Sequence, residues 1–322
     1  MPQPVTSSRL PKVFWLLFFV LFLSACAGVP LQYPALAENS EPFNQPVELH
    51  DTPFHPQEAY QCGPAALATV LQYSGVEQAN PEALADQVYL PDRRGSLQLE
   101  LLGAARRADR IPYVLAPSLA DLLTEVKAGH PVLVLQNLGL RRWPQWHYAV
   151  VIGFDIEQES IILRSGTTER EQLSLRRFEH TWQLADYWAL VVAEPGNTPA
   201  TAEELKYLAA VAAVENQQRL HIAQQGYEAA RQRWPDNATS YLGLGNIAYQ
   251  QQDYAAAEQH YLAAAALKPE QASIYYNLAW AFLRQGKFSK AQQAAQEAEI
   301  LAPEHERYGN AVATVEAAIS DG

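Results

Sequence analysis

The pattern of hydrophobic and polar positions changes near residue 197, and this change divides the chain into two parts. In the first part, apolar positions at helical spacing predict helices over residues 62–73, 81–87, 97–109 and 118–128. Short runs rich in Val, Ile and Leu predict strands over residues 111–115, 131–136, 148–154, 160–163 and 187–193. Because helices come first and most strands follow, we expect an α+β domain with an antiparallel sheet rather than alternating βαβ units.

The second part is helical throughout and repeats itself. Pro235, Pro269 and Pro303 are spaced 34 residues apart. Aligned on these prolines, the copies share aromatic, Leu and Ala positions: Tyr241 with Tyr275, Leu244 with Leu278, Tyr254 with Phe288, and Ala264 with Ala298. This period resembles tetratricopeptide repeats. The resemblance implies three repeats over residues 200–308, the first degenerate, with a concave surface for a protein partner and a tail over residues 309–322.

The N-terminus has the features of a secretory signal peptide. Arg9 and Lys12 precede an apolar run over residues 13–23, and small residues follow. The end of this run, Leu23-Ser-Ala-Cys26, resembles the lipobox of bacterial lipoproteins. The resemblance implies a signal peptide over residues 1–25 and a lipid on Cys26. Since the next residue is Ala27 rather than Asp, it also implies an outer-membrane anchor facing the periplasm. We expect a Pro-rich tether over residues 26–46 and a domain over residues 47–196.

Composition limits the classes of partner and cofactor. Of the 322 residues, 48% are hydrophobic and 18% are charged, which fits a packed core. The formal net charge of −12 disfavours nucleic acid, because phosphate binding requires clustered Lys and Arg. Neither the ligand spacings of a metal site nor the Gly-x4-Gly-Lys motif of an ATP site occurs in the sequence. We therefore predict no cofactor, no metal and no ATP.

Cys62 is the first candidate for chemistry. It opens the predicted helix 62–73 and precedes Gly63 and Pro64. Unpaired N–H groups and the positive end of the helix dipole favour a thiolate there, and thiolates attack carbonyl carbons. If Cys26 carries lipid, Cys62 has no intrachain disulfide partner, because the chain has two cysteines. The alternative interpretation is a small side chain that is simply buried.

His147 is the best candidate for a base that could serve this thiol. The chain has eight histidines, and His147 begins a strongly apolar strand directly behind Trp143 and Trp146. A titratable side chain at the end of a buried strand lies where a fold presents groups to a cleft. The alternative is a hydrogen-bonded histidine of the core.

Together, Gln57-x4-Cys62-Gly-Pro and His147-Tyr-Ala-Val-Val-Ile-Gly resemble the double-glycine, bacteriocin-processing cysteine peptidases, over residues 50–195. The resemblance implies a papain-like fold. It also implies that Cys62 is the nucleophile, that His147 is the general base and acid, and that Gln57 donates to the oxyanion. Gln61 is the competing amide, and the family resemblance also implies that a thiolate–imidazolium pair is available at rest.

The family orients its histidine with an Asp that ends the next strand, and Ser165 stands at that position here. If residues 148–154 and 160–166 form a hairpin, residue 147 faces residue 167. Ser165, Thr167 or Glu169 could then orient the imidazole. Asp155 would lie roughly 26 Å from His147 along the strand, so it is not a substitute.

These observations predict a membrane-anchored periplasmic cysteine peptidase with a protein-binding repeat module. Its partners would be a peptide or protein substrate, a protein on the repeat surface, and the membrane through the lipid. The first alternative is a catalytically weak or inactive domain that acts as a peptide-binding scaffold lipoprotein. An acyl or amide transferase using the same nucleophile is the second, because a thioester does not fix the acceptor.

Overall fold

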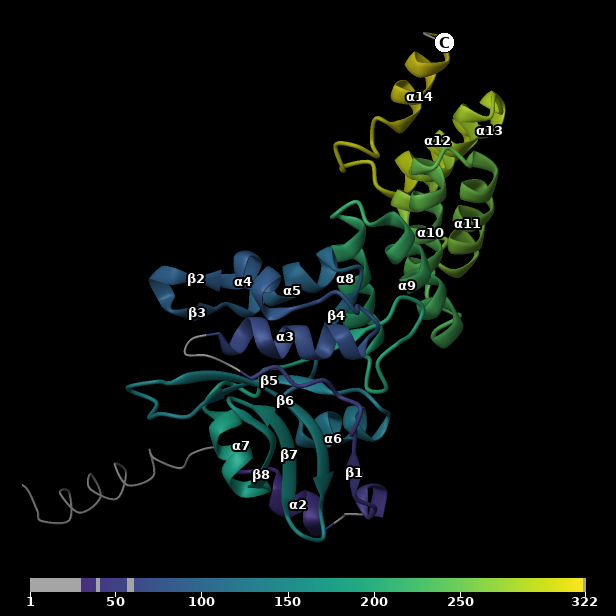
Figure 1. The fold of residues 1–322 in the computed structure, drawn as a ribbon. Coiled ribbons are helices and arrows are strands. Elements are labelled where there is room, and N and C mark those ends of the chain that lie inside the picture. The colour runs from purple at the N-terminus through teal and green to yellow at the C-terminus, as the bar shows by residue number, and fades with distance from the viewer. Residues whose placement is uncertain (1–29, 39–40, 57–60, 321–322) are drawn as a thin grey trace, which may run out of the picture.

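The structure is a computed structural model that describes residues 30–38, 41–56 and 61–320. An antiparallel sheet with helices on both faces forms the first part of the chain, and a helical array forms the second (Figure 1). This confirms the predicted fold class. The signal peptide, Cys26 and Gln57 lie outside the described residues.

The central sheet has seven strands, and its order is β4-β9-β5-β6-β7-β8, with β1 also paired to β6. Its members are β1 (Val47–Glu48), β4 (Ile111–Val114), β5 (Val132–Asn137), β6 (Trp146–Asp155), β7 (Ser160–Ser165), β8 (Thr168–Ser174) and β9 (Ala189–Ala193). All pairs are antiparallel. The five predicted strands are present, whereas β1 and β8 were not predicted.

Helices cover both faces of the sheet because its central strands are apolar on both sides. Along β6, Tyr148, Val150 and Ile152 face one core, and Ala149 and Val151 face the other. The first core lies under α3 (Cys62–Tyr73), α4 (Pro81–Val88) and α5 (Gln98–Arg107). The second lies over α6 (Leu119–Lys127) and α7 (Leu175–Gln183) (Figure 1). The bounds of α3 are those predicted, and α7 was not predicted.

Residues 31–38 and 41–48 pack on the domain, so the predicted tether over residues 26–46 is wrong in these parts. Here the chain forms α2 (Tyr33–Glu38), η2 (Glu41–Phe43) and β1. The buried carboxylate of Glu179 accepts hydrogen bonds from the backbone N–H groups of Gln32 and Tyr33. Phe43 is buried against Phe154 of the sheet. These long-range contacts hold a Pro-rich segment that composition alone assigned to a linker.

The helical array contains α8 (Glu204–Glu215), α9 (Leu220–Arg233), α10 (Ala238–Gln250), α11 (Tyr254–Leu267), α12 (Ala272–Arg284), α13 (Phe288–Leu301) and α14 (Ala311–Ser320). The three phased prolines each follow the second helix of a pair, as predicted. Gly245 lies against the ring of Tyr261, so a Cβ there would clash. The predicted tail contains α14, whose Ala311 and Val315 are fully buried, and this helix caps the array.

The segment that joins the two parts is packed against the first domain. Glu125, fully buried on α6, accepts hydrogen bonds from the N–H groups of Ala200 and Thr201 at 3.1 and 2.6 Å. Buried side chains of β4, α8 and α9 belong to the same hydrophobic core. The first helix pair is therefore built onto the edge strand β4, which fixes the array to the sheet.

Among the residues that the structure describes, no helix has both the length and the apolar content that a bilayer crossing requires.

Candidate active site

A cavity of about 680 Å³ brings Cys62 and His147 to one place. Its wall is completed by residues of other segments: Arg93, Arg94, Gly95, Ser96, Leu97 and Gln98, then Leu135 of β5, Trp146 and Tyr148 of β6, Gly166 after β7, and finally Ala185 and Asp186. Trp143 and Trp146 are 69% and 54% exposed, so neither tryptophan plugs the cavity. The cleft is open to a substrate.

Cys62 is half-buried at the first position of α3, and backbone N–H groups surround its sulfur. The N–H groups of Cys62, Gly63 and Tyr148 all act on the thiol. Tyr148 can do so because the N–H of Leu135, its neighbour on β5, donates to the carbonyl oxygen of Trp188, just before β9. The backbone N–H and C=O groups of Leu135 and Tyr148 therefore point away from each other, which leaves the N–H of Tyr148 for the sulfur of Cys62. Sequence reasoning did not find this donor.

Both titratable groups of the site are shifted towards their neutral forms. Burial raises the pKa of the Cys62 thiol above its usual value, although the three backbone N–H groups oppose this rise. Burial also lowers the pKa of the His147 imidazole, although the charge of Glu171 opposes this fall. These shifts favour a neutral thiol and imidazole over the thiolate–imidazolium pair, whose presence at rest stays a prediction. The helix N-terminus favours the anion, but desolvation in the cleft is the larger effect.

Ser165 holds the imidazole of His147. The distance between Nε2 of His147 and Oγ of Ser165 is 3.0 Å, and Ser165 is 7% exposed. This leaves Nδ1 for the thiol, although no hydrogen bond joins Cys62 to His147 among the described residues. Val150 of β6 pairs with Arg164 of β7. This register places residue 147 opposite residue 167, as expected.

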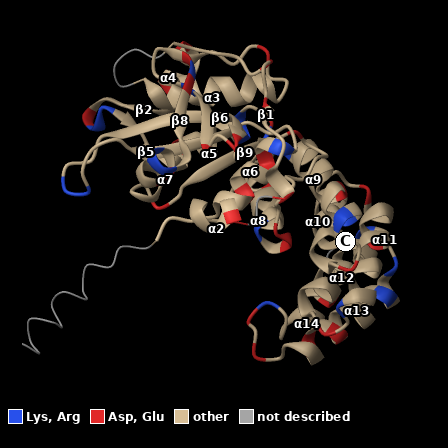
Figure 2. Cartoon of the chain, turned by 90° about the horizontal axis from the view of Figure 1, so that it is seen from below, with Lys and Arg blue, Asp and Glu red and all other residues tan. Residues whose placement is uncertain are grey.

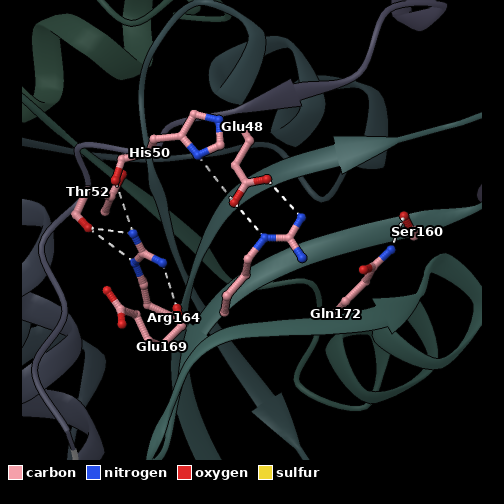
Figure 3. A network of polar contacts seen from close by, with 8 residues as sticks. Glu48, His50, Thr52, Ser160, Arg164, Glu169 and Gln172 are labelled. Atoms are coloured by element: carbon pink, nitrogen blue, oxygen red, sulfur yellow. Dashed lines mark hydrogen bonds and ion pairs between the residues drawn. The ribbon is translucent and has the colours of Figure 1, made fainter.

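The strands behind Ser165 are fixed by a buried arginine (Figure 3). Arg164 donates from Nε and Nη2 to the carbonyl oxygen of Thr52, at 3.1 and 2.8 Å, and from Nη1 to that of Glu169, at 2.7 Å. It thereby ties the segment that leads towards Cys62 to the β7–β8 turn. Arg170 and Glu48 add a bidentate ion pair at 2.8 and 2.9 Å. The element that carries Ser165 therefore has little freedom to move.

Gly63 allows a close approach to the far wall of the cleft. That wall is the small sheet of β2 (Tyr89–Leu90) and β3 (Gly95–Ser96), joined by η3 (Pro91–Arg93). A Cβ at Gly63 would lie 2.4 Å from Oγ and 2.6 Å from Cβ of Ser96. Any larger residue would push β3 away from Cys62. The hydroxyl of Ser96 is buried and has no hydrogen-bond partner.

The other predicted site residues are placed as follows. Gln57 lies outside the described residues, so its role as oxyanion donor stays a prediction. Gln61 is exposed at the N-cap of α3, and its side chain makes no capping bond. Thr167 and Glu169 are exposed, and of the three candidates to orient His147 only Ser165 bonds to it. The wall over residues 93–98 was missed, since its short strands have no periodicity.

The helical array has its own groove. A cavity of about 480 Å³ is lined by Glu215, Asn246, Tyr249, Gln250, Tyr261, Asn277 and Trp280. The side-chain oxygen of Asn246 accepts hydrogen bonds from Tyr261 and Asn277, at 3.0 and 2.9 Å. The groove therefore has aromatic rings beside the amide groups of Asn246 and Asn277.

Comparison with known families agrees with this architecture. Residues 39–189 match the Peptidase_C39 like family and form a peptidase C39-like domain. Residues 245–286 match a TPR repeat and residues 272–305 a tetratricopeptide repeat, so a protein-binding module follows the C39-like domain. The predicted resemblance to double-glycine peptidases fused to tetratricopeptide repeats is thus confirmed.

Solved structures of both kinds resemble parts of the chain. A putative C39-like peptidase from Bacillus anthracis is 22% identical and covers 47% of this chain and 98% of its own, with a TM-score of 0.39. The peptidase domain of Streptococcus ComA is 21% identical and covers 44% and 98%, with a TM-score of 0.37. The first TPR of Spaghetti (RPAP3), bound to an HSP90 peptide, is 17% identical and covers 36% and 93%, with a TM-score of 0.34. No curated protein matches the chain.

Proposed function

We propose that the C39-like domain is a cysteine peptidase in which Cys62 is the nucleophile and His147 the general base and acid. The observation that carries this proposal is the open cavity lined by both residues, in which Ser165 bonds Nε2 of His147 and leaves Nδ1 free. A nucleophile, a base and a group that orients the base are the parts that this chemistry requires.

In this mechanism the pair is neutral at rest. Nδ1 of His147 takes the thiol proton as the sulfur attacks the carbonyl carbon of a bound peptide. The tetrahedral intermediate then collapses: the C–N bond breaks, the imidazolium returns the proton to the leaving amine, and a thioester remains on Cys62. His147 next removes a proton from water, which hydrolyses the thioester and regenerates the thiol. The backbone N–H groups at α3 and Tyr148 supply positive potential at the reacting centre, and Gln57 is the proposed further donor.

Labelling with two electrophiles tests this proposal on a chain that begins at Ala27, in which Cys62 is the single cysteine. Iodoacetamide needs only the thiolate, so its reaction is expected to be slow at neutral pH. It should accelerate as the pH rises, because burial raises the thiol pKa. A peptidyl acyloxymethyl ketone binds in the cleft and recruits His147, so it should modify Cys62 much faster than iodoacetamide does.

Mass spectrometry of the intact chain reads the stoichiometry of each adduct. A peptide library incubated with the unlabelled chain supplies the matching assay of hydrolysis. If the acyl electrophile leaves Cys62 unmodified and no library peptide is cleaved, the peptidase proposal fails.

A peptide-binding domain without catalysis is the second candidate. The support for this candidate is that Ser165, the described residue that bonds to His147, has a hydroxyl and no carboxylate. A hydroxyl orients an imidazole but does not stabilise imidazolium as a carboxylate would. In this case a library peptide would bind in the cleft and remain intact.

We also propose that Cys26 carries lipid and anchors the chain at the periplasmic side of the bacterial outer membrane. The lipobox-like sequence before Cys26 and the following Ala27 support this. When cells that produce the chain are fed an alkyne-tagged fatty acid, the chain is expected to incorporate the tag, and a Cys26→Ala variant to lose it entirely. Equal incorporation in the variant would rule out this anchor.

A further inference from the structure

The loop between β5 and β6 exposes an unusual number of large apolar side chains. Leu138, Leu140, Trp143 and Trp146 are 52%, 66%, 69% and 54% exposed. They are four of the eleven large hydrophobic residues that are exposed in the described part of the chain, and they fall within nine consecutive residues. Single exposed apolar residues are common, but a cluster of this kind marks a contact surface.

The backbone holds this cluster in a fixed hairpin. The N–H of Leu138 donates to the carbonyl of Gln145 at 2.9 Å, and Leu140 and Trp143 exchange two hydrogen bonds at 3.2 and 3.0 Å. Oδ1 of Asn137 accepts from the N–H groups of Gly139 and Gln145. A Cβ at Gly139 would lie 2.5 Å from the carbonyl oxygen of Trp143. The apolar side chains are therefore displayed on a preorganised projection and do not collapse onto the body.

Arg141 and Arg142 form the tip of this hairpin, and neither makes an ion pair or hydrogen bond among the described residues. Figure 2 shows the hairpin extending from the body with a positively charged tip. Since the formal net charge of the chain is −12, an anionic surface would repel most of the molecule. The hairpin combines positive charge, tryptophan and leucine, which is the combination found where proteins meet the lipid headgroup region.

The described chain begins near the same end of the domain. Gln32 and Tyr33 are bound by Glu179, which also accepts from the hydroxyl of Tyr187. Tyr187 follows Asp186, a residue of the cleft wall. An extended chain spans about 3.5 Å per residue, so a lipid on Cys26 would hold Gln32 within roughly 20 Å of a bilayer. That reach is short enough to bring this end of the domain, with its hairpin, to the membrane.

We propose that residues 138–146, here called the Trp-Arg hairpin, dock the cleft end of the domain on a bilayer with anionic headgroups. Trp143 and Leu140 enter the boundary between headgroups and acyl chains, and Arg141 and Arg142 contact lipid phosphates. This proposal requires neither catalysis by Cys62 nor lipid on Cys26. It gives the domain an orientation at the membrane, with the cleft next to the bilayer surface.

Vesicle flotation tests the proposal on the unlipidated chain that begins at Ala27, which retains every residue that the structure describes. The vesicles are phosphatidylcholine alone and phosphatidylcholine mixed with phosphatidylglycerol. The chain is expected to float with the anionic vesicles and to release as salt rises. Replacing both Arg141 and Arg142 by Gln should weaken this binding about 30-fold, because each basic residue contributes about fivefold near an anionic surface. Trp143→Ala should weaken it about tenfold or more, through loss of buried apolar area.

Matched variants separate this role from others. Ile300→Ala removes an equally exposed apolar side chain from the repeats and should leave flotation unchanged, as should Cys62→Ala. All these positions are exposed or half-exposed, and circular dichroism verifies the fold of each variant. Equal flotation of Trp143→Ala and the unchanged chain would overturn the proposal. A second outcome would also overturn it: hairpin variants that still bind vesicles but no longer bind a labelled acidic peptide, as measured by fluorescence anisotropy. The hairpin would then bind substrate rather than lipid.

Discussion

Peptide hydrolysis is expected to fall by about a thousandfold when His147 is replaced by Gln, because general acid–base catalysis typically contributes 10²–10⁴-fold. Gln is close to His in size and can still bond to Ser165, but it cannot accept the thiol proton. The loss should appear in kcat, with KM little changed, since the residue acts on the reacting atoms rather than on substrate binding. Steady-state kinetics on a peptide found in the library screen measures it.

Two further measurements make the His147→Gln result specific. His180→Gln changes an exposed histidine on α7 and should retain full activity. Iodoacetamide alkylation of Cys62 near neutral pH should be similar in the His147→Gln variant and the unchanged chain, because the pair rests neutral. A strong fall in alkylation would instead reveal a thiolate stabilised by imidazolium. Retention of a large part of the hydrolytic activity would remove His147 from the mechanism.

Periodicity and cap residues were sufficient to predict the framework of the C39-like domain. The helix at residues 62–73 begins and ends as predicted, because Gly-Pro at its start and Ser-Gly at its end are local signals. The strand β8 was missed because most of its side chains are exposed and polar. What stabilises it is pairing with β7 and the Arg170–Glu48 ion pair, and both are long-range contacts. The same holds for residues 31–38 and 41–48, which are fixed by Glu179 and by the core around Phe154.

The sequence predicted that Cys62, His147 and Ser165 lie near one another, but it did not predict the electrostatics of the cleft. Cys62, His147 and Ser165 could be found because each stands at the end of a recognisable element. The protonation state could not, because the local dipole of α3 favours a thiolate while the surrounding walls desolvate it. Those walls include Ser96, which sequence offers no means of bringing to Cys62. Burial is a property of the assembled fold, and here it outweighs the local effect.

A carboxylate at position 165 is expected to make the site more reactive. Ser165→Asp places an anion where the hydroxyl now bonds Nε2 of His147 at 3.0 Å. An anion at that distance raises the pKa of the imidazole by about one unit or more. The imidazole then takes the thiol proton in a larger share of molecules, so the thiolate fraction should rise about tenfold, since one pKa unit is tenfold in population. Iodoacetamide alkylation at mildly acidic pH measures this fraction directly.

Ser165→Asn is the matched control, because it has nearly the shape of Asp and carries no charge. It should orient the imidazole without raising its pKa, so alkylation should stay close to that of the unchanged chain. Imidazole titration by NMR should show the His147 pKa rising in the Asp variant alone, against the lowering that burial now imposes. If Asp and Asn variants titrate and alkylate alike, charge at position 165 does not control the pair. If the Asp variant alone responds, the lack of a negative charge at position 165 adds to burial in keeping the resting thiol neutral.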